Sequence, residues 1–308
     1  MSEPNGEYDY YPNIIEEGVT FPGIAIGYLG LIDGDRVTHL TTEDFQMEDP
    51  WSIAMRQAIN KVNSDGWFAG HTMLELGIGD GRNVREAANG GKLAGIVGVD
   101  VDAYKIDVAE ANLKSDSNTA SLPRTYYEGD AVSVLEYLGM KQTAVPDRVL
   151  MCLPQSNDGL QTSTADASDD FPAHAPFRPD WDHLGLRLNA GALTRLAEIA
   201  SPQTETLVIL SDRIPAEIHS LLFEQTGWQI ESIVVHERVR QDFDTKLDWM
   251  SHLEDDGQRF FDETGLPLSI EEAVGRINAF DPLQNQAKLD VYHDVTVYRL
   301  KLNTDRLA

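Results

Sequence analysis

Apolar and polar positions form two recurring patterns through the middle of the chain. Short apolar runs bounded by Gly, Asp or Pro predict strands at His71–Leu76, Ala94–Val99, Arg124–Glu128, Arg148–Leu153, Thr206–Leu210 and Trp228–His236. Between these runs, apolar residues recur at three- and four-residue spacing, which predicts helices at Asn83–Ala88, Ala103–Leu113, Val132–Leu138, His183–Ile199 and Ala216–Gln225. The alternation predicts a doubly wound α/β fold, with a mostly parallel sheet covered by helices on both faces.

The C-terminal part of the chain departs from this alternation. Helical spacing covers Phe243–Phe261 and Ile270–Phe280, and a strongly alternating strand pattern follows at Asp294–Leu302. We expect this last strand to pair beside Trp228–His236 as an antiparallel edge of a seven-stranded sheet. Residues 46–308 then form one domain with an insertion at about 237–293, and the Gly-rich residues 1–45 form an N-terminal extension.

The composition indicates a packed protein with an unusually acidic surface. The 308 residues are 42% hydrophobic, which is enough for a sizeable core. They include 51 acidic and 24 basic side chains, giving a formal net charge of −27. Concentrated salt screens such self-repulsion, so the charge favours a halophilic protein over an ordinary acidic enzyme. The absence of a basic cluster in the sequence disfavours an extended nucleic-acid surface.

Cysteine content and the N-terminal segment bear on the compartment. The single cysteine, Cys152, permits no internal disulfide, which fits a reducing compartment. Acidic residues stand where a signal peptide needs basic ones, and the longest apolar run, Ile24–Ile32, is too short to span a bilayer. We therefore expect a soluble, cytoplasmic protein without membrane association. Within its apolar strand, Cys152 is expected to be a buried, inert thiol and not a nucleophile.

A glycine-rich motif follows the first predicted strand. It reads Glu75-Leu-Gly77-Ile-Gly79-Asp-Gly81 and leads directly into a predicted helix. Glycine adopts backbone conformations closed to other residues and allows a ligand close to the main chain. The dinucleotide pattern G-x-G-x-x-G would need glycine at position 82, where Arg82 stands, so the motif is not that of an NAD site.

Carboxylates follow the next two strands in the same order. Asp100 ends the second strand, 19 residues after Gly81, and Asp130 follows the third. With the glycine motif they resemble the class I S-adenosylmethionine-dependent methyltransferases. The resemblance implies that Asp100 accepts hydrogen bonds from the ribose hydroxyls and Asp130 from the adenine amine. It assigns S-adenosylmethionine binding to Glu75, Gly77, Gly79, Gly81, Asp100, Val101, Gly129, Asp130 and Ala131. Taken singly, the loop is also compatible with a tight turn and each aspartate with a helix N-cap, which is the commoner role for a residue in the position of Asp130.

The fourth strand bears on the acceptor. Leu153-Pro154-Gln155 lies where amino-methylating relatives carry Asn-Pro-Pro-Tyr, and leucine cannot grip an amide or amine nitrogen as that asparagine does. With Cys152 it resembles the methyltransferase domain of methionine S-methyltransferase. The same resemblance extends over residues 47–302, through Met47–Ala54, Asp182–Ala190, Asp255–Gly265 and Val291–Leu302. It implies catalysis at Leu153, Pro154 and Gln155 and a small-molecule acceptor, for example the thioether of methionine.

Several expectations concern the acceptor side. A thioether has no proton to lose, so positioning suffices and no general base is needed. The acidic loop Asp166–Asp182 offers Trp181 and Asp182, with Phe171, Phe177 and Asp170, to a cationic product; the alternative is a solvated loop. His174 and His183 are second-choice bases, and Trp51 either covers the cofactor or anchors a helix. No metal-ligand spacing occurs in the sequence. The competing functions are a protein or RNA N-methyltransferase and a non-catalytic binding module.

Overall fold

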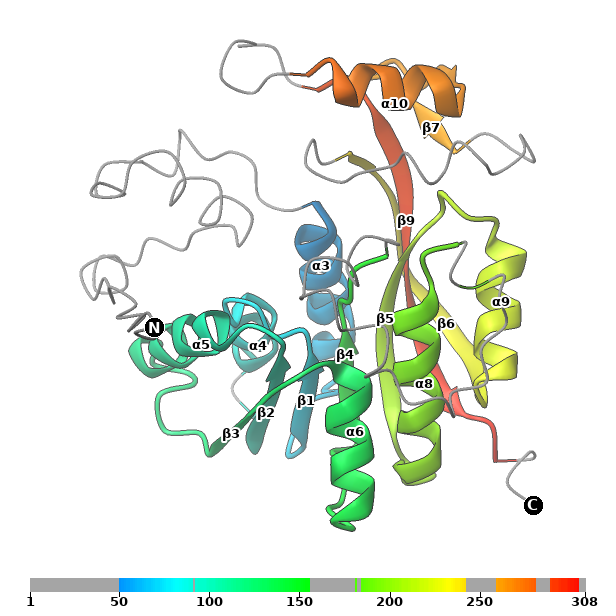
Figure 1. Ribbon diagram of the computed structural model, residues 1–308. Helices are drawn as coiled ribbons and strands as arrows, with labels where there is room; N and C mark the ends of the chain where they lie inside the picture. The colour runs from blue at the N-terminus through cyan, green and yellow to red at the C-terminus, as the bar shows by residue number, and fades with distance from the viewer. Residues whose placement is uncertain are drawn as a thin grey trace, which may run out of the picture.

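The computed structural model describes residues 50–90, 92–155, 181, 184–241, 259–280 and 289–304. A nine-stranded sheet runs through the centre, and helices lie on both of its faces (Figure 1). The predicted extension at 1–45 and all of the acidic loop at 166–182 except Trp181 lie outside these residues. None of the described helices is long and apolar enough to cross a bilayer.

Five parallel strands form the first part of the sheet. They are arranged in the order β3 (Arg124–Glu128), β2 (Gly95–Asp100), β1 (Thr72–Leu76), β4 (Arg148–Met151) and β5 (Glu205–Ser211). The chain moves outward from β1 to β3 and then returns to the other side of β1 at β4. Open α/β sheets bind ligands beside the carboxyl ends of strands at such a reversal, so the loops after β1 and β4 mark the candidate site.

The antiparallel strand predicted near the C-terminus is confirmed as β9 (Tyr292–Leu302). It pairs with β6 (Trp228–Arg240), as expected, but it is not an edge strand, because its other side pairs with β5. The sheet also has nine strands and not the expected seven, since two short strands of the insertion join it. Thr296, for example, lies opposite Leu210 on β5 and His236 on β6. The last strand of the chain therefore separates two strands that precede it, which brings the start of β9 to the carboxyl end of β5.

Helices cover the two faces of the sheet in groups of three. One face carries α3 (Pro50–Ser64), α4 (Arg82–Ala88) and α5 (Ala103–Ser115); the other carries α6 (Ala131–Met140), α8 (Arg187–Ile199) and α9 (Ala216–Gln225). Successive strand residues point to opposite faces. On β5, Leu207 belongs to the core under the first group and Val208 to the core under the second. Both cores are thus built by alternating residues of the same buried strands, as the apolar runs predicted.

The predicted strands and helices of the sheet region are confirmed, with differences at some ends. β4 ends at Met151, so Cys152 follows the strand and is only partly buried, contrary to the expectation of a buried thiol. α8 begins at Arg187, four residues after the predicted start. α3 was not predicted as a helix, although its buried residues do recur at helical spacing: Ala54, Met55, Ala58, Ile59 and Val62.

The insertion differs from its prediction at one point. Phe260–Phe261, expected at the end of a helix, forms the short strand β7, which pairs with β8 (Pro267–Leu268) and with Tyr292. The rest of that predicted helix lies outside the described residues. α10 (Ile270–Asn278) follows, started by a reciprocal cap between Ser269 and Glu272. These elements share a small core at one end of β9 (Figure 1), made by Phe260, Leu268, Ile270, Ala273, Ile277, Leu289 and Val291.

Candidate active site

The glycine loop turns sharply after β1. Gly77, Gly79 and Gly81 all have positive φ, at 81°, 54° and 80°. A Cβ on Gly77 would lie 3.3 Å from Leu153 Cδ2, and one on Gly81 would lie 3.3 Å from Leu113 Cγ. A Cβ on Gly79 would meet no described atom within 4 Å. Gly77 and Gly81 thus allow close packing against neighbouring elements, whereas the backbone at Gly79 is open to a ligand.

Asp100, at the end of β2, holds the glycine loop in place through a hydrogen bond. Its Oδ2 accepts a hydrogen bond from Gly79 N at 2.9 Å and its Oδ1 accepts one from Asp102 N at 3.1 Å. A carboxylate has about four acceptor positions, so each oxygen keeps one for a ligand hydroxyl. The next side chain, Val101, is 67% exposed and presents an apolar surface beside this carboxylate.

Asp130 caps α6 from the end of β3. Its Oδ1 accepts hydrogen bonds from Val132 N at 3.0 Å and Ser133 N at 2.9 Å, so the N-cap interpretation is confirmed. Gly129 N donates to Asp100 O at 2.9 Å, which joins this turn to the end of β2. Both cap bonds use the same carboxylate oxygen. The cap therefore holds the side chain in place and uses only Oδ1; the contact of Asp130 with an adenine amine remains a prediction.

Glu75 lies on β1 beneath the glycine loop and is fully buried. Its pKa is raised from 4.5 to about 8, mainly by burial; a hydrogen bond from Asn83 Nδ2 to Glu75 Oε1, at 2.8 Å, opposes this rise, and the charges of Asp80 and Asp100 add to it. The side chain is therefore protonated at neutral pH. In this structure it ties β1 to α4, and its contact with a cofactor stays a prediction.

The segment after β4 places its three predicted residues differently. Leu153 is buried in the core with Trp181, whereas Pro154 is exposed. Gln155 is 4% exposed, and its Oε1 accepts a hydrogen bond from Ser211 N at 2.9 Å. The structure thus places Trp181 in the hydrophobic core. Its contact with a substrate stays a prediction. The other acceptor-side candidates, Asp170, Phe171, His174, Phe177, Asp182 and His183, lie outside the described residues.

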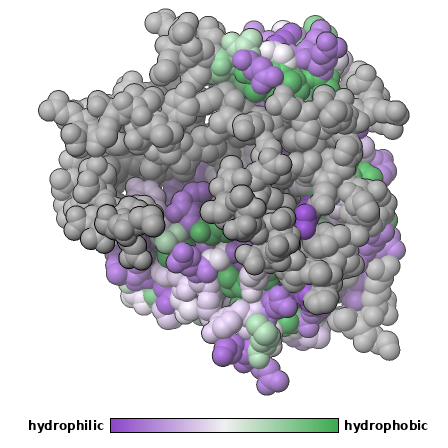
Figure 2. Space-filling view, viewed as in Figure 1, coloured by the Kyte–Doolittle hydropathy of each residue, from purple (hydrophilic) through white to green (hydrophobic). Residues whose placement is uncertain are grey.

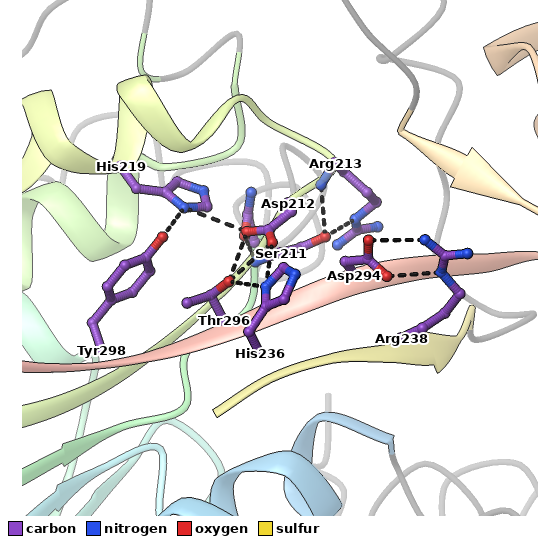
Figure 3. Close-up of polar contacts among 10 residues, drawn as sticks. Ser211, Asp212, Arg213, His219, His236, Arg238, Asp294, Thr296 and Tyr298 are labelled. Atoms are coloured by element: carbon purple, nitrogen blue, oxygen red, sulfur yellow. Dashed lines mark hydrogen bonds and ion pairs between the residues drawn. The ribbon is translucent and has the colours of Figure 1, made fainter. Parts of the chain in front are cut away.

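A polar network missed by the sequence interpretation lies beyond β5 (Figure 3). Asp212 Oδ2 accepts a hydrogen bond from Thr296 Oγ1 at 2.9 Å and lies 3.2 Å from His236 Nδ1. His219 Nδ1 lies 3.7 Å from Asp212 Oδ1 and 3.1 Å from the Tyr298 hydroxyl. Burial lowers the pKa of His219 to about 4 and raises that of Asp212, so His219 is neutral here. These residues come from four separate elements, and no sequence spacing connects them.

A second group adjoins this network at Ser211 and Arg213, on the opposite side of Ser211 from His219 (Figure 3). Arg213 Nε donates to Ser211 Oγ at 2.8 Å, and the guanidinium carbon lies 5.7 Å from the centre of the Trp51 ring. Trp51 Nε1 donates to His293 Nε2 at 3.2 Å. Trp51 therefore joins the first turn of α3 to the start of β9, which supports the anchoring interpretation of this residue.

The described surface is mixed in character. In the view of Figure 2, hydrophilic side chains cover much of it, and hydrophobic patches lie between them and beside α10. Among the residues with described positions, no group of three or more His, Cys, Asp or Glu is arranged to hold a metal ion.

The strand order β3-β2-β1-β4-β5, with antiparallel β9 between β5 and β6, defines a doubly wound α/β sheet whose first five strands are parallel. No protein-family model and no curated protein sequence matches the chain.

Solved structures that resemble the chain are described as methyltransferases, at low sequence identity. A candidate RNA methyltransferase from Pyrococcus horikoshii is 13% identical, with a TM-score of 0.47 over 91% of this chain and 97% of its own. NSun6 from the same organism, solved with SFG, is 11% identical, with a TM-score of 0.43 over 83% and 52%. A TehB-like methyltransferase from Corynebacterium glutamicum is 11% identical, with a TM-score of 0.39 over 95% and 100%. At these levels, any function for this chain must be inferred from its own residues.

Proposed function

We propose that this protein is an S-adenosylmethionine-dependent methyltransferase that acts on a small molecule. The observation that carries the proposal is the juxtaposition of three consecutive strand ends. The open backbone of Gly79, the carboxylate of Asp100 and the capping carboxylate of Asp130 follow β1, β2 and β3, which are neighbours in the sheet. Such a row of acceptors beside an open loop suits a nucleoside, whose ribose hydroxyls and exocyclic amine are donors.

The residues fit the cofactor part by part. Asp100 would accept both ribose hydroxyls at the positions its backbone bonds leave open, and Val101 would lie against the adenine ring. Asp130 would accept from the adenine amine, and Gly79 would allow the chain of the cofactor close to the loop. When bound, S-adenosylmethionine supplies an electrophilic methyl group on a sulfonium. The role of these residues is to hold that methyl group in line with a nucleophile.

A thioether, such as that of methionine, is the acceptor proposed here. Position 153 is a leucine buried in the core, so it offers no oxygen to grip an amide or amine nitrogen. A thioether needs no such grip and loses no proton on methylation, so positioning by the segment Leu153-Pro154-Gln155 suffices. The acidic composition further leads us to propose a salt-rich cytoplasm as the setting.

Calorimetric titration of S-adenosylmethionine into the full chain in molar KCl tests the cofactor assignment. We expect saturable binding with a micromolar dissociation constant; binding no tighter than millimolar would overturn it. Incubation with methyl-labelled cofactor and a cell extract then tests the acceptor. Label in a small sulfonium product supports the proposal. Label in a macromolecule would favour a protein or RNA N-methyltransferase, and binding without any transfer would favour a non-catalytic module.

A further inference from the structure

A buried polar group lies next to the proposed cofactor loop, at the carboxyl ends of β4 and β5. We call it the acceptor-side cluster and define it by Trp51, Gln155, Ser211, Arg213 and His293. Its members form a continuous series of contacts, from Gln155 to Ser211, Ser211 to Arg213, Arg213 to Trp51, and Trp51 to His293. Gln155 is two residues from Leu153, whose side chain contacts the glycine loop at Gly77. The segment that follows β4 therefore connects the cluster to the glycine loop.

Gln155 contributes a buried hydrogen-bond donor. Its Oε1 must face Ser211, because a backbone N–H can only donate, and this fixes the orientation of the side-chain amide. The amide nitrogen, Nε2, is then turned away from Ser211. It is buried and has no hydrogen-bond partner among the described residues. A buried donor without a hydrogen-bond partner destabilises the fold, and such donors commonly bind a ligand, an ion or a water molecule.

His293 contributes a second donor. The side chain is 1% exposed, and burial, together with the charge of Arg213, lowers its pKa well below its ordinary value, so the ring is neutral. Its Nε2 accepts the indole proton of Trp51, which can only donate. In a neutral ring the proton must then be on Nδ1. That atom is buried and lacks a hydrogen-bond partner in the described part of the chain.

Arg213 adds positive charge to the same place. It is 3% exposed, and it donates to Ser211 Oγ and, at 3.4 Å, to Gln241 Oε1. Burial removes the hydration of a charged group at a high cost in free energy, so charged side chains are rarely buried this deeply. The guanidinium lies close enough to His293 to lower the pKa of its ring, and Arg213 shares Ser211 as a hydrogen-bond partner with Gln155, in a chain whose net charge is −27. The cluster thus contains a buried positive side chain within a strongly acidic protein.

We propose that the acceptor-side cluster binds the carboxylate of the methyl acceptor, with Gln155 Nε2 and His293 Nδ1 as donors and the positive charge of Arg213 close by. A carboxylate accepts hydrogen bonds and donates none, which matches two donors. Its two oxygens need fewer donors than the three acceptor oxygens of a phosphate group, which also carries a charge of about −1.5 to −2 at pH 7. The proposal rests on the proposed function, since it assigns the cluster to the substrate of that same enzyme, and it narrows the substrate to small carboxylic acids.

Matched acid and amide probes test the carboxylate site. The full chain, saturated with S-adenosylhomocysteine in molar KCl, is titrated calorimetrically with methionine against methioninamide and with acetate against acetamide. We expect the acid of at least one pair to bind at least about tenfold more tightly than its amide, because a neutral amide cannot pair with the guanidinium. Equal binding within both pairs, or no binding of either acid, would overturn the proposal.

Two variants assign the preference to the cluster. Gln155→Glu keeps an oxygen for Ser211 N but replaces the free donor with a second oxygen, so the acid preference should vanish. The matched control, Gln203→Glu, makes the same change at an exposed position after α8 and should leave the preference intact. If Gln155→Glu does not fold, His293→Phe removes the other donor and should weaken acid binding at least about tenfold. An acid preference that persists in the folded variant would overturn the assignment.

Titration with S-adenosylmethionine on the same proteins, without S-adenosylhomocysteine, separates the two proposals. Cofactor binding without an acid preference would retain the proposed function and overturn the carboxylate site. An acid preference without cofactor binding would retain the carboxylate site and overturn the proposed function.

Discussion

The two halves of the candidate site present opposite hydrogen-bonding character along one edge of the sheet. On the cofactor side, after β1 to β3, Asp100 and Asp130 offer carboxylate oxygens beside an open glycine backbone. On the acceptor side, after β4 and β5, Gln155 and His293 offer buried donors beside a guanidinium. The cofactor side therefore offers hydrogen-bond acceptors, and the acceptor side offers hydrogen-bond donors. The contrast indicates how one sheet edge would orient two different molecules toward each other.

The two halves also differ in how the chain builds them. On the cofactor side, Gly79 and Asp100 are 21 residues apart and belong to one strand–helix–strand unit. On the acceptor side, Trp51 and His293 are 242 residues apart and meet only because β9 returns beside β5. The first half is a property of a local motif, whereas the second depends on the completed sheet.

The largest expected effect is that of Asp100→Ala on the cofactor side. The change removes the proposed acceptor for both ribose hydroxyls and releases Gly79 N. Hydrogen bonds to a charged group contribute about 1.5–3 kcal/mol each, so the affinity for S-adenosylmethionine should fall by at least about 100-fold. Calorimetry measures this, with Asp107→Ala, an exposed position on α5, as the control. An unchanged affinity would mean that the ribose lies elsewhere.

Glu75 should make stability depend on pH. Its pKa is raised on folding to about 8 from 4.5, so the folded state holds the proton more strongly. Its contribution to stability is fully present below about pH 4.5 and is lost as pH rises through 8, with a maximum slope of about 1.4 kcal/mol per pH unit. Glu75→Gln, a neutral isostere, should lack this slope. Chemical denaturation of both proteins between pH 5 and pH 9 compares them; parallel stability curves would contradict the buried, protonated carboxyl.

Two glycine substitutions should separate ligand access from packing. Gly79→Ala and Gly81→Ala both place alanine at positive φ, at a cost of roughly 1–2 kcal/mol. Only the Gly81 substituent also meets Leu113, at 3.3 Å, so Gly81→Ala should be the less stable protein. The Gly79 substituent enters open space, so Gly79→Ala should lose roughly tenfold in cofactor affinity. Thermal melts and calorimetry measure the two effects; Gly79→Ala with wild-type affinity would contradict an open ligand site.

The smallest expected effect concerns Asp130, which has a structural and a proposed binding role. Asp130→Ala removes the N-cap of α6, which should cost about 1 kcal/mol of stability. Asp130→Ser retains one capping oxygen and should recover most of that loss. If the second carboxylate oxygen holds the adenine amine, the serine variant will still bind S-adenosylmethionine more weakly than the wild type. Equal affinity in a stable serine variant would reduce Asp130 to a cap.

The sequence by itself determined strands β1 to β6 and β9 and the glycine motif of the proposed cofactor side, because these depend on local signals. Buried parallel strands read as apolar runs, and a glycine loop between a strand and a helix is recognisable by its spacing alone. The capping role of Asp130 follows from its position before α6. α3 carried a comparable local signal in its apolar spacing, so a closer interpretation of the sequence would have found it.

Only the tertiary structure decided where β9 lies and what gathers beside it. Pairing between β5 and β9 joins segments about ninety residues apart in sequence, and no local pattern shows which edge a strand will take. The tautomer of His293 depends on Trp51, and the orientation of Gln155 depends on Ser211, so neither donor is visible in the sequence. Local chemistry thus specified the cofactor side, and long-range packing specified the acceptor side, because its donors exist only when distant segments meet.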